Sequence, residues 1–508
     1  RLLAASEAGE RVAVVGDYDV DGVSATALLT AVFRACKLEV LPILPERLQE
    51  GYGFQPVHVD TASREGCRLI VTADCGSTAT DAVARSRDAG IDVIVTDHHL
   101  GADQLLPEWV IEINPHRADS AYPFADLSGV GVAFKLATAL ASAAGRDIDP
   151  AALLRVTCLG TICDLVPLLG ENRVIAALGL RAMADSRSAG LQALMRKAGV
   201  EAPVDAVDVG FRIGPRINAA GRLASPRPAL DLLLTTDRSQ AERLAADLDR
   251  WNRERQGAEM EVVEEAERMF EGIDPLPPLL VGWKEGWHLG VLGIAAGRLA
   301  RRFHRPTLLL SVDGGLAKGS GRGVSKVHLY NFLADRREDY ERFGGHSQAV
   351  GSSVATADLH ALREHWLEVA ERDWHPDWLT KSFEYELDIP AEAINAELLA
   401  DLSRLEPFGM DNRQPILRTG PLRLSGPPRR FGRGHLAARA VGESGSAVEL
   451  LGWGWQARED DLDGTFEALG TLETDRYRGG PVLRLVDARS WVDPQSNPID
   501  RVAESIGE

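Results

Sequence analysis

Short apolar runs alternate with helix-forming segments through the first 115 residues, and this alternation constrains the fold more than any other feature. The runs cover residues 12–16, 39–44, 68–73, 92–97 and 109–114. Segments such as 22–36 and 78–90, which separate some of them, are rich in helix formers. Strands that are apolar throughout are buried on both faces, as in a parallel sheet covered by helices. The sequence therefore predicts an α/β domain with a parallel sheet.

The rest of the chain divides into four segments of different pattern. Residues 130–235 contain Ala-rich periodic stretches that predict helices. Residues 237–271 are highly charged with one glycine and no proline, which predicts one long connecting helix or two shorter helices with a kink. Residues 275–375 show strand, helix and strand patterns, and we expect a second small α/β domain. After residue 380, short β-type segments between Gly/Pro turns indicate a closed barrel or a sandwich.

Composition places the chain among ordinary globular proteins. Its 508 residues are 45% hydrophobic and 26% charged, and no run of 18 uncharged apolar residues predicts a membrane helix. The start, RLLAASEAGER, lacks both a secretory core and a Met, so we expect a trimmed chain. Five cysteines without CxxC spacing favour neither a disulfide framework nor a zinc site, so we expect a cytoplasmic protein. The net charge of −19 argues against nucleic-acid binding by the surface as a whole, so such an interface must be local.

Carboxylates and histidines follow three of the predicted strands where each strand ends. They are Asp17, Asp19 and Asp21 after the first run, Asp74 after the third, and Asp97, His98 and His99 around the end of the fourth. The carboxyl ends of parallel strands meet at one edge of a sheet, so we expect these side chains to converge. A further charge, Asp164, interrupts the apolar segment 158–168 and needs a partner there.

Carboxylate oxygens with one imidazole are ligands that suit Mn²⁺ or Mg²⁺ better than a structural zinc ion. With so many carboxylates we expect two ions, the arrangement that serves in-line phosphoryl displacement. Adjacent histidines in an extended chain point to opposite sides, so we expect His98 and His99 to differ, one as a ligand and the other facing substrate. Each motif alone also has a structural interpretation: a solvated turn for DxDxDG, a structural histidine pair, and a helix cap or buried ion pair for Asp164.

Four motifs, GDYDVDG, TADCG, TDHH and GTICDLVPL, resemble in order and spacing the phosphoesterase motifs of the DHH family. Segments 210–223, 320–323 and 343–351 resemble its RecJ branch, the single-strand-specific 5′→3′ exonucleases, and the resemblance covers roughly residues 10–420. It implies four parts: a DHH phosphoesterase domain at 1–235, a connecting helix at 236–274, a DHH-associated substrate-binding α/β domain at 275–375 and an OB-like single-strand-binding barrel at 376–508.

Carried over residue by residue, the resemblance implies that two Mn²⁺ or Mg²⁺ ions are held by Asp19, Asp21, Asp74, His98 and Asp164. Asp74 would bridge the ions, and Asp17 and His99 would lie beside them in supporting or catalytic roles. Small phosphoesterases of the family carry a His four residues before the aspartate that corresponds to Asp19, where this chain has Val15. The RecJ branch shares this departure, which leaves the coordination of one ion open.

Basic residues concentrate in three stretches of this acidic chain. Residues 209–227 hold four Arg and no acid, and residues 404–440 hold eight Arg against two acids. Residues 297–326 hold seven Arg or Lys against Asp313. Each stretch is either a phosphate-binding patch or a solvated face. Within the first stretch, Arg216, Asn218 and Arg222 are candidate substrate contacts.

The segment KGSGRG is expected to be a flexible loop whose Ser320 and Arg322 grip a phosphate. The resemblance makes His346 a further substrate contact, and Arg47 is a candidate for recognising a 5′-phosphate. Aromatic residues near these segments could stack on bases or pack in cores; they are Tyr52 and Phe54 near the site, and Trp453 and Trp455 in the predicted barrel.

These features together predict a two-metal exonuclease that degrades single-stranded DNA from the 5′ end to mononucleotides in repair and recombination. By resemblance we expect a monomer that works with a single-strand-binding protein and a helicase. Two alternatives stay open from the sequence. One is a DHH phosphodiesterase acting on short oligonucleotides or cyclic dinucleotides, and the other is a non-catalytic replication scaffold.

Overall fold

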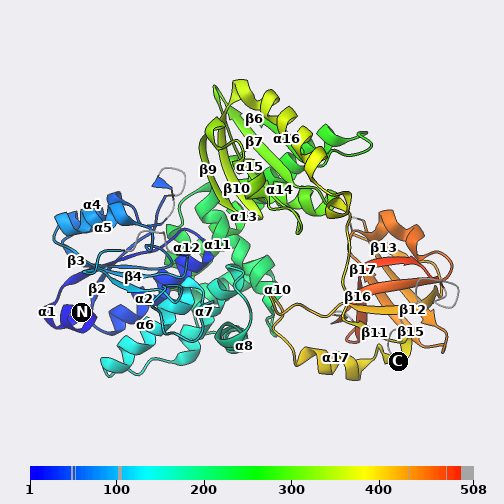
Figure 1. Cartoon of the computed structure of the whole chain (residues 1–508). Helices are drawn as coiled ribbons and strands as arrows, with labels where there is room; N and C mark the ends of the chain where they lie inside the picture. Colours follow the sequence, from blue (N-terminus) through cyan, green and yellow to red (C-terminus); the bar gives the residue numbers. More distant parts are fainter. Residues whose placement is uncertain (47–49, 52, 101–105, 433, 476–477, 493–508) are drawn as a thin grey trace. The chain divides into compact units, whose positions relative to one another are not determined.

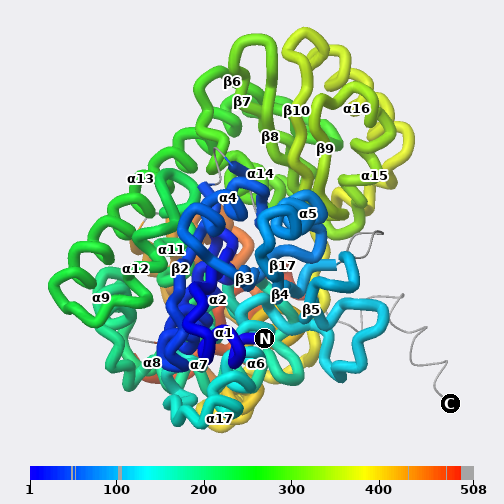
Figure 2. Tube along the Cα trace, turned by 90° about the vertical axis from the view of Figure 1, so that its left-hand side faces the viewer, coloured from blue at the N-terminus to red at the C-terminus, as the bar shows by residue number. Residues whose placement is uncertain are grey.

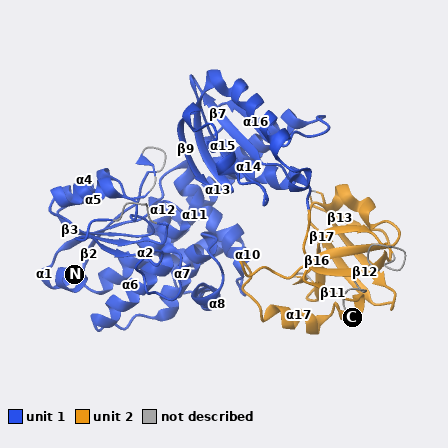
Figure 3. Cartoon of the chain, viewed as in Figure 1, with its two compact units in different colours: residues 1–381 blue, residues 382–508 orange. Residues whose placement is uncertain are grey.

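The chain forms two compact units, residues 1–381 and 382–508, each described here by itself (Figure 3). The computed structural model describes residues 1–46, 50–51, 53–100, 106–432, 434–475 and 478–492. The predicted candidates Arg47 and Tyr52 lie outside these residues. No helix within the described part is long and apolar enough to cross a membrane.

The first unit opens with the predicted parallel sheet (Figure 1). Its strand order is β2-β1-β3-β4-β5, and every neighbouring pair is parallel. The strands are β1 (Arg11–Val15), β2 (Glu39–Ile43), β3 (Cys67–Thr72), β4 (Asp92–Thr96) and β5 (Ile111–Ile113). Polar groups that follow β1, β3 and β4 therefore leave the sheet at the same edge.

Alternate residues of the central strands pack into two separate cores. Val12 and Val14 of β1 face a core that includes α2 (Val20–Ala35) and α6 (Gly129–Ala143). Ala13 and Val15 face a core that includes α4 (Pro56–Arg64) and α5 (Thr80–Asp88). Both faces of the sheet are thus covered by helices, which explains why the strands are apolar throughout. Phe54 is 3% exposed in the second core, so of its two interpretations core packing is confirmed.

A helical region follows the sheet and ends in a single long helix. The shorter elements are α7 (Pro150–Cys163), α8 (Gly170–Ala184), α9 (Ala189–Ala198), α10 (Ala206–Asp208), the π-helical turn η1 (Val209–Ile213), α11 (Gly214–Leu223) and α12 (Arg227–Leu234). Helix α13 (Arg238–Phe270) runs unbroken for 33 residues, past α9, α12 and α11 towards β6 (Figure 2). The Asp237 side chain caps it by accepting the Gln240 N–H. The prediction of one connecting helix is therefore confirmed over the kinked alternative.

The second lobe of this unit is the predicted small α/β domain. Its sheet has the order β6-β7-β8-β10-β9, in which only β6 and β7 are parallel. The strands are β6 (Leu280–Glu285), β7 (Thr307–Asp313), β8 (Leu316–Arg322), β9 (Tyr340–His346) and β10 (Ala349–Ala355). Three helices pack with them: α14 (Leu289–Phe303), α15 (Leu329–Ala334) and α16 (Leu359–Asp373).

The expectation of a flexible loop at KGSGRG is wrong, because these residues form most of the central strand β8. The glycines serve close packing inside the sheet. A Cβ at Gly319 would lie 2.2 Å from the Leu309 carbonyl oxygen, and one at Gly321 would lie 3.0 Å from Leu329 Cδ2. Ser320 and Arg322 are consequently held on a rigid strand.

The second unit is a closed barrel, which confirms the OB-like prediction over a sandwich. Its sheet has the order β11-β12-β16-β17-β15-β14-β13, and a further pairing of β12 with β14 closes it. The strands are β11 (Leu387–Asp388), β12 (Leu417–Leu424), β13 (Arg429–Phe431), β14 (His435–Gly442), β15 (Ala447–Gly452), β16 (Phe466–Thr474) and β17 (Pro481–Ser490), with helix α17 (Ala396–Ser403) before β12. Trp455 is buried in the barrel core, whereas Trp453 is 53% exposed.

Candidate metal centre

The turn between β1 and α2 brings the first three aspartates to the edge of the sheet. Glycines make this tight turn possible: a Cβ at Gly16 would lie 1.9 Å from Thr26 Oγ1, and one at Gly22 would lie 2.5 Å from the Asp17 backbone nitrogen. Asp19 caps α2, since its Oδ1 accepts the Gly22 N–H at 3.0 Å. The glycine-rich DxDxDG turn therefore caps α2 and also positions the aspartate carboxylates at the edge of the sheet.

Asp21 is 1% exposed and is fixed by the start of another helix. Its Oδ2 accepts the Gly129 N–H at 2.7 Å, and its Oδ1 accepts the Val130 N–H at 2.9 Å. Both donors belong to the first turn of α6, where the helix dipole favours a carboxylate. A Cβ at Gly160 of α7 would lie 2.3 Å from Asp21 Oδ1, so the two helices close tightly around this side chain.

Asp74 follows β3 in a backbone conformation that favours glycine, with φ of 65°. The residue is 2% exposed. The start of α6 approaches it so closely that a Cβ at Gly129 would lie 2.2 Å from Asp74 Oδ1. A strained residue at the end of a strand, packed against a helix start, is typical of a functional position.

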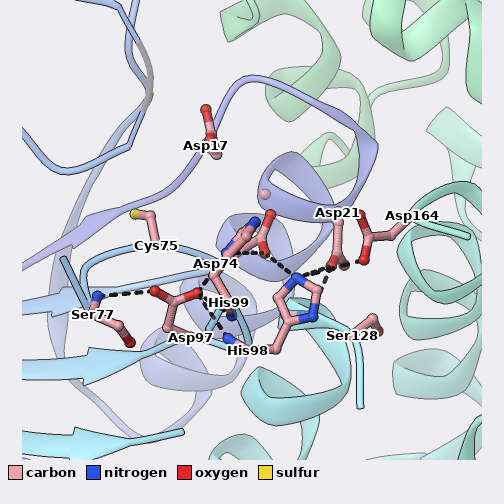
Figure 4. A network of polar contacts seen from close by, with 12 residues as sticks. Asp17, Asp21, Asp74, Cys75, Ser77, Asp97, His98, His99, Ser128 and Asp164 are labelled. Atoms are coloured by element: carbon pink, nitrogen blue, oxygen red, sulfur yellow. Dashed lines mark hydrogen bonds and ion pairs between the residues drawn. The ribbon is translucent and has the colours of Figure 1, made fainter. Parts of the chain in front are cut away.

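The His98 imidazole lies at the centre of the predicted ligands (Figure 4). Its Nε2 lies 3.2 Å from Asp74 Oδ1, 3.5 Å from Asp164 Oδ2 and 4.0 Å from Asp21 Oδ2. Burial and the neighbouring His99 lower the pKa of His98 to about 4, so the ring is neutral near pH 7. A neutral imidazole is the form that ligates a metal.

The expectation that the adjacent histidines point to opposite sides is wrong, because their ring centroids lie 4.5 Å apart. His99 nevertheless has a partner of its own. Its Nδ1 lies 2.8 Å from Asp97 Oδ1, and this hydrogen bond raises the pKa of His99 to about 9. Burial opposes ionisation of Asp97, but hydrogen bonds from His99 and Ser77 outweigh it and lower the pKa of this carboxyl. Asp97 therefore holds His99 as a cation beside the carboxylates.

The sequence places Asp97 at a strand end but does not indicate its role. The structure shows that it accepts the backbone N–H groups of Ser77, His98 and His99 at 2.8–3.1 Å. Asn114, which was not singled out, donates to Ser77 Oγ at 2.9 Å and to the His99 carbonyl at 2.8 Å. The signal for Asn114 was its position at the end of the fifth apolar run, the same place as the other site residues.

The carboxylates repel one another in the protein alone. Burial is the first cause and mutual repulsion the second, and together they raise the pKa of Asp17 to about 6 and that of Asp164 to about 7. The pKa values of Asp21 and Asp74 are also raised, by burial and by the other aspartates. Asp19 contributes to every one of these shifts, so it lies within the same electrostatic cluster.

Two buried atoms of this cluster, Asp74 Oδ1 and His98 Nε2, have no hydrogen-bond partner among the described residues. These residues belong to two groups whose potential ligand atoms all lie within 4.8 Å of one another. One group is Asp74, His98 and His99, and the other is Asp21, His98 and Asp164. Crowded carboxylates with orphaned lone pairs and a neutral imidazole fit one or two divalent cations. Asp17 belongs to neither set and points away from the His98 ring in Figure 4.

The other predicted site residues lie in different settings. The Asn218 Oδ1 atom accepts the Val20 N–H at 3.2 Å, so this side chain supports the aspartate turn. Arg216 is in an ion pair with Asp249 of α13 at 2.9 Å. Arg222 donates to the Gly290 carbonyl at 3.2 Å, at the start of α14.

Ser320, Arg322 and His346 all lie on the sheet of the second lobe. Ser320 and Arg322 sit against α14, because a Cβ at Gly293 would lie 3.2 Å from Ser320 Oγ and 2.8 Å from Arg322 Nη2. Burial lowers the pKa of Arg322. A partly buried guanidinium without a carboxylate neighbour among the described residues is suited to an anionic ligand.

Many cations of the three basic stretches are neutralised by neighbouring acids. Examples are Arg212 with Asp208, Arg227 with Asp231, Arg302 with Glu267, Arg418 with Glu467 and Arg430 with Glu459. Counting basic residues within each stretch therefore overstates the positive surface, since these acidic partners lie outside the three stretches, some of them only four residues from the arginine. In the barrel, Arg429 instead lies over the Phe431 ring at 5.5 Å.

Three segments match known protein families: residues 11–161 match the DHH family, N-terminal domain, residues 276–371 the DHHA1 domain and residues 385–486 the RecJ OB domain. Over 420 residues the chain is 36% identical to the single-stranded-DNA-specific exonuclease RecJ of Bacillus subtilis. That alignment covers 82% of this chain and 52% of the relative, so the chain spans about half of that protein's length.

A solved structure, RecJ from Thermus thermophilus in complex with Mn²⁺, is similar with a TM-score of 0.81 and 30% sequence identity. The match covers 97% of this chain and 71% of that one. RecJ from the same organism in complex with Mg²⁺ gives a TM-score of 0.76 at 29% identity, covering 97% of this chain and 69% of that one. The similarity therefore extends over both compact units and includes the strand ends that carry the candidate ligands.

Proposed function

The chain belongs to the RecJ family of DHH phosphoesterases, and we propose that it is a metal-dependent exonuclease that degrades single-stranded DNA from the 5′ end. The observation that carries the proposal is the convergence of Asp21, Asp74 and Asp164 on the neutral His98 imidazole. A degenerate scaffold has no reason to keep such a mutually repulsive cluster buried. DNA repair and recombination is the setting in which we place this activity.

Two Mn²⁺ or Mg²⁺ ions are the cofactors that we propose for the cluster, with Asp19, Asp21, Asp74, His98 and Asp164 as ligands. Bound ions would supply Lewis-acid stabilisation of the phosphate oxygens and a nucleophile at neutral pH. Both metals named in the structures of the relatives suit this ligand set, which is consistent with hard oxygen donors and one imidazole.

Residues of the chain itself would stabilise negative charge and exchange protons around the scissile phosphate. His99, kept protonated by Asp97, would offset the negative charge that develops on phosphate oxygens. The α6 start fixes Asp21 through two backbone N–H groups, so this ligand needs no reorganisation during the reaction. The Asp17 carboxyl, with a pKa of about 6, can exchange a proton near neutral pH.

The substrate contacts that we propose lie mainly on the second lobe. Ser320 and Arg322 would hold the phosphate of the strand end, with His346 on the same sheet and Arg222 beside the start of α14. Arg47 stays a candidate from the sequence. The ion pair of Arg216 and the hydrogen bond of Asn218 support positioning roles for these two residues in place of direct substrate contact.

The barrel offers an exposed aromatic group for a single strand. Trp453 meets His435 edge to face with ring centroids 4.8 Å apart, and lies 5.7 Å from Phe431. Aromatic faces beside Arg429 would stack with successive bases whatever their sequence. We propose this group as the single-strand-binding surface of the barrel.

We further propose that the chain acts as a monomer in the cytoplasm, with a single-strand-binding protein and a helicase as partners. All five cysteines are free, which supports a reducing compartment. The domain boundaries proposed are 1–235, 236–274, 275–375 and 376–508. They place α13 between the two lobes and the barrel strands in the last segment.

Substrate choice tests the proposal. The chelated protein is supplied with Mn²⁺ and given a long single strand, the matching duplex, a dinucleotide or a cyclic dinucleotide. We expect rapid hydrolysis of the single strand only, and its loss in Asp74→Ala. Preferred turnover of the dinucleotides would move the chain to the small-substrate phosphodiesterases, and turnover of none would favour the scaffold.

A further inference from the structure

A polar row crosses the second-lobe sheet on the face that carries Ser320 and Arg322. Because side chains alternate along a strand, Lys318, Ser320 and Arg322 of β8 share one face. In the antiparallel pairing, Ser353 of β10 lies opposite Lys318, and Arg342 of β9 lies opposite Ser353. Lys318, Ser353 and Arg342 form a row that crosses three strands, two residues or about 6.6 Å along β8 from Ser320.

The two cations of this row are exposed, and neither is in an ion pair within the described ranges. Other arginines of the same lobe are paired, such as Arg302 with Glu267 and Arg336 with Asp339. Glu341 is the one carboxylate among the described lining residues of the adjoining hollow, and it is exposed. Lys318 and Arg342 are therefore available to a ligand.

Glycines leave open space between this row and Arg322. Gly351 lies opposite Ser320 on β10, and Gly344 lies opposite Gly351 on β9. A Cβ at either glycine would meet no atom within 4 Å. A hollow of about 630 Å³ lies here, and Leu289 and Leu292 of α14 form its apolar side. Glycine inside a strand often marks the close approach of a ligand to the backbone.

We propose that Lys318, Ser353 and Arg342 form a second phosphate-binding subsite beside the strand-end subsite of Ser320 and Arg322. A lysine and an arginine flanking a hydroxyl provide charge-assisted hydrogen bonds to phosphate oxygens. The open space at Gly344 and Gly351 leaves room for the atoms that join this phosphate to the phosphate held by Ser320 and Arg322. The inference rests on the proposed function, which supplies a substrate rich in phosphate.

The outer phosphate of a strand with a 5′-triphosphate is the group of such a substrate that suits this subsite. The backbone phosphate next to a 5′-monophosphate is not the occupant, because it is the scissile phosphate in a release of mononucleotides and would lie at the metal cluster. The first experiment leaves the strand out and measures binding of inorganic tripolyphosphate to the metal-free protein by calorimetry. K318Q/R342Q is expected to bind about tenfold more weakly than wild type.

The matched control is K326Q/R337Q, which removes one lysine and one arginine from the same lobe outside the row, and its affinity should equal that of wild type. Gly351→Val is a second variant. Valine suits a strand, and its side chain would occupy the open space of the hollow without meeting another atom, so this variant should also lose tripolyphosphate binding. Unchanged affinity in K318Q/R342Q, or an equal loss in the control, would overturn the subsite.

The second experiment compares degradation of 5′-monophosphorylated and 5′-triphosphorylated strands with Mn²⁺. A loss in K318Q/R342Q confined to the triphosphorylated strand supports the outer phosphates as the occupant, and an equal loss with both strands contradicts it. Full activity of the variant on both strands contradicts a subsite that serves the substrate. If wild type degrades neither strand, the proposed function fails, and the subsite is judged by tripolyphosphate binding alone.

Discussion

His99 Nδ1 lies 2.8 Å from Asp97 Oδ1, and the same carboxylate oxygen also accepts the His99 backbone N–H at 3.1 Å. The Asp97 side chain thus fixes both the position and the charge of His99, the second histidine of the DHH motif. The pKa of His99 rises from 6.5 to about 9 mainly through this hydrogen bond. The DHH motif therefore combines a neutral imidazole, His98, with a protonated one, His99.

Asp97→Asn should lower the pKa of His99 towards 6.5, because the amide keeps the shape but loses the charge. The alkaline limb of the rate profile should move to lower pH, and turnover at neutral pH should fall by about 10–100-fold. NMR titration of the His99 ring in the metal-free protein, together with kcat against pH, measures both. A His99 pKa unchanged from wild type would contradict the role of Asp97.

The metal-free protein should become less stable as pH rises from about 5 to about 8. Burial and repulsion raise the pKa values of Asp17 to about 6 and Asp164 to about 7, above the ordinary value of 3.8. A raised pKa in the folded state means that stability is present at low pH, where the group is protonated, and is lost as pH rises through the folded value. Calorimetry of the chelated protein across this range tests the direction.

Added Mn²⁺ should reverse this trend, since ions and protons compete for the same carboxylates. We expect the rise in Tm on adding Mn²⁺ to grow with pH, and to disappear in a variant with Asp74 and Asp164 replaced by Asn. A larger metal-induced shift at pH 5 than at pH 8 would show that another site dominates.

Gly129→Ala should weaken metal binding by about 10–100-fold, because the new methyl group would displace the Asp74 carboxylate. Calorimetric titration with Mn²⁺ measures the affinity, and circular dichroism checks the fold. Gly257→Ala is the matched control, since a Cβ there meets nothing within 4 Å in the middle of α13. It should leave metal affinity unchanged and raise the unfolding free energy by about 0.5–1 kcal/mol.

Asn218→Ala separates a positioning role from a substrate contact. Its Oδ1 accepts the Val20 N–H, so loss of this acceptor should loosen the start of α2 and the Asp19–Asp21 turn. We expect lower Mn²⁺ affinity and lower kcat with little change in KM. A raised KM with normal metal affinity would instead restore Asn218 to the substrate contacts that the sequence predicts.

The parallel sheet and the position of the candidate metal centre were predictable because both follow from local sequence. Apolar runs such as 68–73 identify buried strands, and the topology of a parallel sheet brings Asp74 and His98 to one edge without any further information. Asp164 was identifiable as an interruption of the apolar segment 158–168, and it lies at the C-cap of α7. Alternation in an extended chain did not predict the directions of His98 and His99, since the two rings lie side by side with centroids 4.5 Å apart.

Partners that lie far apart in sequence were not predictable in this way. Nothing in the segment KGSGRG shows that Gly319 packs against the Leu309 carbonyl, so a strand was interpreted as a loop. The sequence puts Arg216 in a basic stretch, and only the structure shows its ion pair with Asp249 of α13. The row of Lys318, Ser353 and Arg342 likewise depends on strand order and register, which the sequence does not specify.

The most direct test of the central claim is the polarity of degradation. The protein is incubated with Mn²⁺ and a long single strand labelled at its 5′ end or at its 3′ end. The account predicts early release of the 5′ label as mononucleotide, abolished by EDTA and by Asp74→Ala, while the 3′ label stays in long products. Early release of the 3′ label, or release that survives Asp74→Ala, would contradict it.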